Sequence, residues 1–251
     1  MTTSQVVHLA VGLVALLAVA QGVLLAAGVR IGRAPAVALA RGVAQLAVVG
    51  LVLRGAITAL PAVIAVLAVM LTTASWTATS RLRALDRAGR AVVAACAAGT
   101  AVALGVVFAI PVLPRESRYL IAMGGIVIGG TMTGATLTGR HLVAGLRARR
   151  EEVEGWLALG ARPRQAVLDI ARSSVAEALV PALDQTRTTG LVTLPGSFIG
   201  ALLGGASPTQ AARFQAVVLA ALLCAQSVTA VVLIGFLGAP ERIPVEPERA
   251  G

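Results

Sequence analysis

Few residues of the sequence could bind or move a charged solute, and those few lie in or beside long apolar stretches. Glu177 precedes Asp184 by seven residues, so the two carboxylates share one face if this segment is a helix. Their hard oxygens suit a metal cation, but the spacing also fits an ordinary solvent-exposed helix face. Arg187 follows Asp184 by three residues and can pair with it directly. Such a pair is either structural or part of a translocation path.

Most enzymatic chemistries lack their residues. All 21 basic residues are Arg, and without Lys the chain can form neither a P-loop nor a Schiff base. His8, His141, Cys96 and Cys224 are too scattered for a zinc site or a disulfide framework, and the cysteines are either small apolar residues or redox groups. Ser197 does not lie in a Gly-Xaa-Ser-Xaa-Gly elbow. We therefore expect no catalytic residue, metal site or cofactor in this chain.

The composition indicates a membrane protein. Hydrophobic residues make up 57% of the chain and charged residues 13%, and the mean hydropathy is +0.89. A soluble domain would have about a quarter of its residues charged. The formal charge is +10, but with one Tyr, two Trp and four Phe the chain lacks the stacking groups of a nucleic-acid-binding face. The expected partner is the lipid bilayer and not a nucleic acid.

Seven apolar stretches are long enough to cross a bilayer, which needs about 20 residues of helix. One of them contains Arg41, which could extend its side chain to the interface or be a buried functional residue. The sequence predicts an all-α, polytopic helix bundle in a single domain, residues 1–251. The expected spans are 6–29, 35–53, 55–80, 91–114, 119–139, 188–212 and 214–240.

The arginines predict the orientation, because Lys and Arg in short loops stay on the cytoplasmic side. The loops on the other side hold Arg54, Arg115 and Arg118. We expect a multi-pass protein of the plasma membrane with its N-terminus outside and its C-terminus in the cytoplasm. The loops expected inside contain Arg30, Arg33, Arg81, Arg83, Arg87, Arg90, Arg140, Arg147, Arg149, Arg150, Arg162, Arg164, Arg172 and Arg187.

Glycine and proline patterns predict helix contacts and a helix break. Gly196, Gly200 and Gly204 repeat at four-residue intervals, which allows close packing of helices within the chain or between two copies. Pro195 followed by Gly196 should interrupt a helix, and the break is either a gating position or a tolerated kink. Met132 is either a packing residue or a soft metal ligand.

A long polar segment, about residues 141–187, separates the fifth and sixth expected spans. Leu168, Ala171, Val175 and Leu179 recur at helical spacing and predict an amphipathic helix. Ahead of it, a helix should end near Gly160 and another should start at Pro163, because Gly suits a helix C-cap and Pro a first turn. The segment therefore predicts a short helix-turn-helix in the cytoplasm.

The run Leu-Gly-Ala-Arg-Pro-Arg-Gln-Ala, residues 159–166, resembles the coupling loop of ABC transporter permeases, which docks on the ATPase subunit. The motifs that follow, from Asp184 to Gln215, resemble the FetB-type iron-export permeases, a family that includes a plant branch linked to aluminium tolerance. Arg41 to Gln45 and Gly129 to Met132 match more weakly. The chain departs from the pattern at Arg187, where the family has Lys, and at Gly130, where the bacterial pattern has Asn.

The resemblance implies a permease subunit that exports iron, pairs with a second copy of itself, and uses a separate ATPase that binds ATP and Mg²⁺. It implies ATPase coupling through Glu154, Leu159, Gly160, Ala161, Arg162, Pro163 and Gln165. It implies a path that contains Arg41, Gln45, Met132, Glu177, Asp184, Arg187, Pro195 and Gly196, with Gly200 and Gly204 in helix packing. An ABC permease for another cargo and an ATP-independent transporter or channel are the alternatives, and the latter ordinarily carries more ionisable groups inside its spans.

Overall fold

The computed structural model describes residues 3–56, 59–110 and 112–239, and the regular elements of this part of the chain are helices plus one isolated bridge between Thr189 and Thr193. The chain divides into two compact units, Met1–Ala56 and Ile57–Gly251. The first unit holds α1 (Thr3–Ala26) and α2 (Ala34–Ala56). Gly28 and Gly32 adopt positive φ between them, a conformation that suits glycine at a tight turn.

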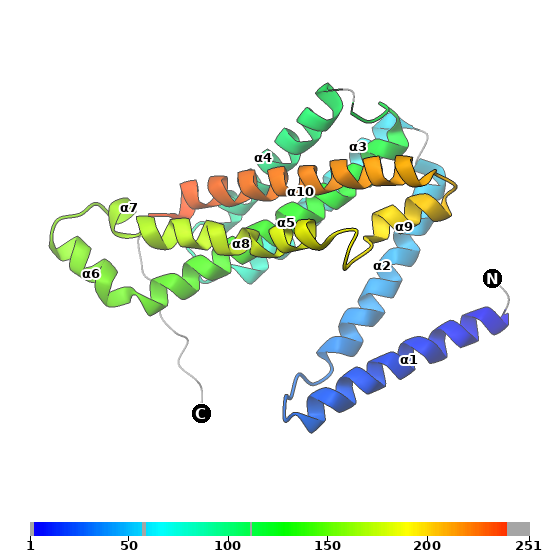
Figure 1. The fold of residues 1–251 in the computed structure, drawn as a ribbon. Coiled ribbons are helices and arrows are strands. Elements are labelled where there is room, and N and C mark those ends of the chain that lie inside the picture. Colours follow the sequence, from blue (N-terminus) through cyan, green and yellow to red (C-terminus); the bar gives the residue numbers. More distant parts are fainter. Residues whose placement is uncertain (1–2, 57–58, 111, 240–251) are drawn as a thin grey trace. The chain divides into compact units, whose positions relative to one another are not determined.

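The second unit holds eight helices, and α10 contacts four of them, namely α4, α5, α8 and α9 (Figure 1). Thr229 of α10 donates a hydrogen bond to the carbonyl oxygen of Ala95 on α4, and Arg213 donates to Val112, just beyond the other end of α4. The two helices are therefore antiparallel. The unit consists of α3 (Leu60–Arg81), α4 (Ala88–Ala109), α5 (Ser117–Ala148), α6 (Arg150–Ala158), α7 (Pro163–Ala166), α8 (Leu168–Thr188), α9 (Gly196–Leu203) and α10 (Pro208–Leu237).

In the described part of the chain, six helices are long and apolar enough to cross a membrane: α1, α2, α3, α4, α5 and α10. The prediction of an all-helical polytopic bundle is confirmed. The interpretation of residues 1–251 as one domain stays a prediction.

The expectation that residues 188–212 form one continuous membrane-spanning helix is wrong. The chain forms a compact loop after Thr188, then the short α9, then a second turn. Gly190 and Gly205 have φ of 89° and 91°, values that end a right-handed helix, and Pro195 has no N–H for a helical hydrogen bond. The chain therefore runs beside α10 in two helical pieces, α8 and then α9, as Figure 1 shows.

Two expected boundaries also shift. α5 continues past residue 139 to Ala148 and carries the bundle into the polar segment. α10 begins at Pro208 and not at residue 214, because Ser207 caps it: the Ser207 side chain accepts from the Gln210 backbone, and the Gln210 side chain accepts from the Ser207 backbone. This reciprocal capping satisfies two N–H groups at the helix start.

Two apolar clusters fill the second unit. The first, which includes Leu82, Leu146 and Leu233, lies at the end where α5 continues into α6. The second, which includes Val107, Met123 and Val218, lies at the opposite end. Gly99 lies between the two, where a Cβ atom would be 2.6 Å from the carbonyl oxygen of Ala225. Glycine is required here because α4 and α10 approach too closely for a side chain.

Candidate functional site

The predicted helix-turn-helix is present, and we call residues 149–167 the elbow. α6 ends at Ala158, and Gly160 has φ of 86°, so the expected glycine turn is confirmed. Pro163 is the first residue of α7, as expected. The side chain of Gln165 accepts a hydrogen bond from the Arg162 backbone N–H at 3.0 Å. This bond fixes the start of α7 because a first-turn N–H has no partner within its helix.

The outer face of the elbow is exposed and partly apolar. Trp156 is 52% exposed and Leu159 83%, although both belong to a charged segment. The predicted coupling residues lie on this surface, with Ala161 half-buried and the others exposed: Glu154, Leu159, Gly160, Arg162, Pro163 and Gln165. Exposed Trp and Arg side chains are the types that most often anchor protein interfaces.

The inner face of the elbow is part of the core. Val153 of α6, Ala166 of α7 and Val167 are buried in the first apolar cluster, together with Leu146 of α5 and Leu233 of α10. Protein cores are densely packed and barely compressible. The elbow is therefore anchored in the same core as the ends of α5, α8 and α10.

Charge pairs fix the junction between α5 and α6. Arg149 donates two hydrogen bonds to Glu152, at 2.7 and 2.6 Å, and Arg150 donates to Glu154 at 2.7 Å. The hydrogen bond from Arg149 is the main reason that the pKa of Glu152 lies below its ordinary value. The same carboxylate thus fixes the junction and lies one helical turn from the exposed Trp156.

The structure places the candidate path residues of α8 on its exposed side. Glu177, Asp184 and Arg187 are all exposed, and Arg187 pairs with Asp184 at 3.5 Å, as the spacing predicted. Of the expected apolar stripe, Ala171 is buried and Val175 and Leu179 are half-buried, whereas Leu168 is exposed. Ile170 and Ser174 are buried beside them. The stripe is shifted because α8 packs against α5 and α10 together.

Glu177 lies in a groove of about 370 Å³ between α5 and α8 that also contains His141, Arg149 and Ser173. Sequence reasoning had set His141 aside because no second ligand is near it in the sequence. The proximity of His141 and Glu177 could have been predicted from a continuation of α5 into the polar segment, because this continuation brings His141 beside α8. Within the described residues, no group of three or more metal-ligating side chains is present.

Three further candidate path residues are on α2 and α5. Met132 of α5 is half-buried and packs against the first apolar cluster, which favours its interpretation as a packing residue. Arg41 and Gln45 are exposed residues of α2, in the first unit. Within the second unit, the structure therefore does not gather the predicted path residues at one site.

Pro195 and Gly196 start α9 after the predicted break, which is confirmed. Gly196, Gly200 and Gly204 face open space. Among the described residues, no atom of another helix lies within 4 Å of a Cβ placed at any of the three. The loop before α9 exposes apolar side chains as well, with Leu191 93% exposed. This surface is free to contact lipid or a second copy.

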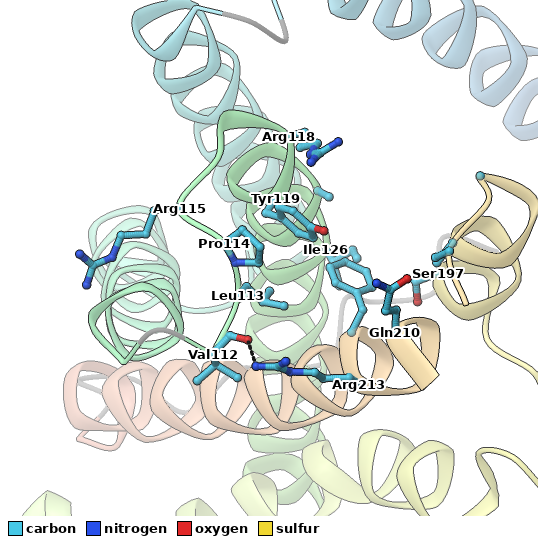
Figure 2. Close-up of a pocket in the computed structure, with 15 residues that line it drawn as sticks. Val112, Leu113, Pro114, Arg115, Arg118, Tyr119, Ile126, Ser197, Gln210 and Arg213 are labelled. Carbon is cyan, nitrogen blue, oxygen red and sulfur yellow. Dashed lines mark hydrogen bonds between the residues drawn. The ribbon is translucent and has the colours of Figure 1, made fainter. Parts of the chain in front are cut away.

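A cavity of about 1260 Å³ lies at the end of the second unit opposite the elbow, between the loop after α4, the start of α5, α9 and the start of α10 (Figure 2). Arg115, Arg118 and Arg213 line it, beside Tyr119 and Gln210. Sequence reasoning used Arg115 and Arg118 only for orientation. Their common site was not visible because α10 begins about a hundred residues later in the chain.

Membrane-length helices packed around a common core define this chain as a polytopic helical membrane protein. The chain belongs to the family described as "Uncharacterised protein family (UPF0014)", which matches residues 6–239. No solved structure matches the chain.

Three relatives illustrate the family. The "UPF0014 membrane protein STAR2" of Oryza sativa subsp. japonica is 36% identical over 77% of this chain and 69% of its own length. "Protein ALUMINUM SENSITIVE 3" of Arabidopsis thaliana is 32% identical over 64% of this chain and 59% of its own length. The "Probable iron export permease protein FetB" of Escherichia coli (strain K12) is 26% identical over 76% of this chain and 75% of its own length.

Proposed function

We propose that this chain is the membrane subunit of an ABC exporter and that a separate ATPase supplies the energy. The ATPase binds ATP and Mg²⁺ and docks on the elbow from the cytoplasm. Two copies of the chain form the permease in the plasma membrane, with each N-terminus outside and each C-terminus inside. The relative named as an iron export permease supports this function.

The two-faced elbow is the observation that carries the proposal. Its exposed side offers Trp156, Leu159 and Arg162 to a partner, and its buried side, with Val153 and Ala166, is continuous with the helix core. A partner that closes on nucleotide can pull on the exposed side. The buried side then transmits the pull to the membrane helices, because a packed core moves as a unit.

The proposed cargo is iron, and Glu177 with His141 is its proposed first contact. The carboxylate and the imidazole lie in one groove beside the elbow, and both ligand types bind iron. From there the path follows α8, past Asp184 and Arg187, to the break at Pro195 and Gly196, where a discontinuous helix offers unpaired backbone groups. Arg41, Gln45 and Met132 are further candidates for the lining.

Copurification and ATP turnover with the cognate ATPase test the docking role. Arg162→Glu and Trp156→Ala should each lower copurification and ATP turnover, because each removes an exposed side chain of the elbow that would contact the ATPase. The chain provides matched controls: Arg172 is an exposed arginine on α8, and Trp76 is an exposed tryptophan on α3. Arg172→Glu and Trp76→Ala should leave both measurements unchanged. Unchanged assembly and turnover after Arg162→Glu would remove the basis of the proposal.

Iron content tests the cargo. Cells that lack the gene should accumulate iron, and expression of the chain with its ATPase should reverse this. Glu177→Gln should reduce export while ATPase binding persists, and Asp169→Asn on the same helix is the control. Equal iron content with and without the gene argues for an ABC permease with another cargo. Transport by the purified chain in liposomes without nucleotide would establish the ATP-independent alternative.

A further inference from the structure

The cavity opposite the elbow combines cationic and apolar surfaces. Its volume is about 1260 Å³, larger than most small-molecule sites, which measure roughly 300–1,000 Å³. Leu113, Ala122 and Ile126 provide apolar wall, and the rings of Tyr119 and Phe214 form a tilted pair with centroids 6.2 Å apart. A small inorganic anion would leave most of this wall uncovered.

The three arginines of the cavity differ in whether their guanidinium groups are already used in hydrogen bonds within the protein. The side chain of Arg115 points away from the other labelled residues in Figure 2 and donates to the carbonyl oxygens of Phe108 and Ala109 at the end of α4. It therefore serves as a cap for α4. Arg118 and Arg213 remain as the cations available to a ligand.

Among the described residues, Arg213 donates one hydrogen bond, of 3.2 Å, to the Val112 carbonyl oxygen. A guanidinium has five N–H groups, so most of its donors remain for a ligand. Arg118 pairs with Glu116 at 2.5 Å and lies 5.4 Å from the centroid of the Tyr119 ring. The Gln210 carbonyl oxygen accepts from Ser207, which leaves its NH₂ group as a further donor.

The charges at this end of the unit favour an anion. Arg118 lies in the first turn of α5, where the helix dipole disfavours a cation, and its partner Glu116 is the N-cap of α5. Glu116 offsets one charge, so the positive charges of Arg115 and Arg213 remain for an anion in the cavity to offset. α5 and α10 are of membrane-spanning length, so a bilayer that both helices cross would place their first turns toward one of its headgroup layers.

We propose that this cavity binds an anionic phospholipid, with the phosphate near Arg118 and Arg213 and the acyl region along Ala122, Ile126 and Phe214. The shared chemistry is a phosphate, which a free solute could also supply. The apolar wall favours the lipid, because a free phosphate gains nothing from it.

Native mass spectrometry of the purified full chain in nonionic detergent tests the proposal. Phosphatidylglycerol should bind about tenfold more tightly than phosphatidylcholine with the same acyl chains, because both headgroups carry the phosphate but the quaternary ammonium of phosphatidylcholine would lie beside the two arginines and be repelled. Inorganic phosphate at millimolar concentration should not displace it. Equal binding of the two lipids would contradict the role of charge, and displacement by inorganic phosphate would identify a site for a free anion.

Arg118→Gln and Arg213→Gln should each weaken phosphatidylglycerol binding about tenfold, and Arg172→Gln at the other end of the unit should not. Since loss of Arg213 could also loosen the loop at Val112, a second kind of variant is needed. Ala122→Trp fills the apolar wall without touching a charge, and it should abolish binding of the lipid. Unchanged binding in folded Ala122→Trp and Arg118→Gln proteins, checked by thermal unfolding, would overturn the assignment.

Discussion

Ser197 of α9 donates a hydrogen bond to the side-chain oxygen of Gln215 on α10, at 2.5 Å, and Gln215 is almost fully buried. This bond joins the short second piece of the broken passage to the long helix beside it. α9 packs against α10 but has no buried residue of its own. The polar pair therefore adds a directed contact to a lightly buried interface.

Ser197→Ala should loosen α9 and lower the stability of the protein by about 1 kcal/mol, with a larger loss if Gln215 stays without a partner. Amide hydrogen exchange over residues 196–203, compared with α10, measures the loosening. Ser80→Ala is the matched control, because the Ser80 hydroxyl donates its hydrogen bond to Thr77 within its own helix. Equal exchange in both variants would show that other contacts position α9.

Gly99 and Gly105, both on α4, allow a test of close packing between α4 and α10. A Cβ at residue 99 would meet the Ala225 carbonyl, whereas nothing lies within 4 Å of one at Gly105. Gly99→Ala should destabilise the protein by about 1–3 kcal/mol through overpacking. Gly105→Ala should be neutral or stabilising, because Ala favours a helix. Thermal unfolding in detergent compares the two, and equal shifts would contradict the tight crossing.

A second pair of glycines, Gly160 and Gly155, tests whether the turn of the elbow requires a glycine. Gly160 has φ of 86°, which a side chain disfavours, whereas Gly155 lies within α6 and has open space around it. Gly160→Ala should distort the turn at a cost of about 1 kcal/mol or more and should reduce ATPase copurification. Gly155→Ala should preserve it. If both variants bind the ATPase equally, the conformation at Gly160 is not needed for docking.

The lowered pKa of Glu152 predicts a pH dependence of the elbow. Its folded pKa lies below the ordinary value because Arg149 hydrogen-bonds to the charged carboxylate. The Arg149–Glu152 pair therefore stabilises the folded elbow fully above the ordinary pKa of glutamate, about 4.3. This stabilisation is lost as the pH falls through the lowered pKa of Glu152 in the folded protein. Trp156 follows Glu152 by four residues on α6, so its indole fluorescence can respond to the charge of this carboxylate.

Trp156 fluorescence, measured in a Trp76→Phe background, should stay constant from about pH 8 to pH 5 and change only below about pH 4. Glu152→Gln should remove the transition. A transition near neutral pH, or one that persists in Glu152→Gln, would assign the signal to another group.

The local elements were predictable because their signals are short in sequence. Apolar stretches of membrane-spanning length located six helices, and Gly160 with Pro163 located the turn of the elbow. The three-residue spacing of Asp184 and Arg187 predicted their pair. Each signal depends on helix geometry or backbone freedom over a few residues, which tertiary packing here did not override.

The tertiary structure decided which distant segments meet. The burial of Val153 and Leu233 in one apolar cluster, the shared groove of His141 and Glu177, and the cavity between Arg118 and Arg213 all join residues far apart in the chain. The sequence indicated that residues 188–212 were apolar, but not that they form a loop and a short helix beside α10. Hydropathy records only the preference for an apolar environment, whereas packing between helices determines which face is buried and against which neighbour.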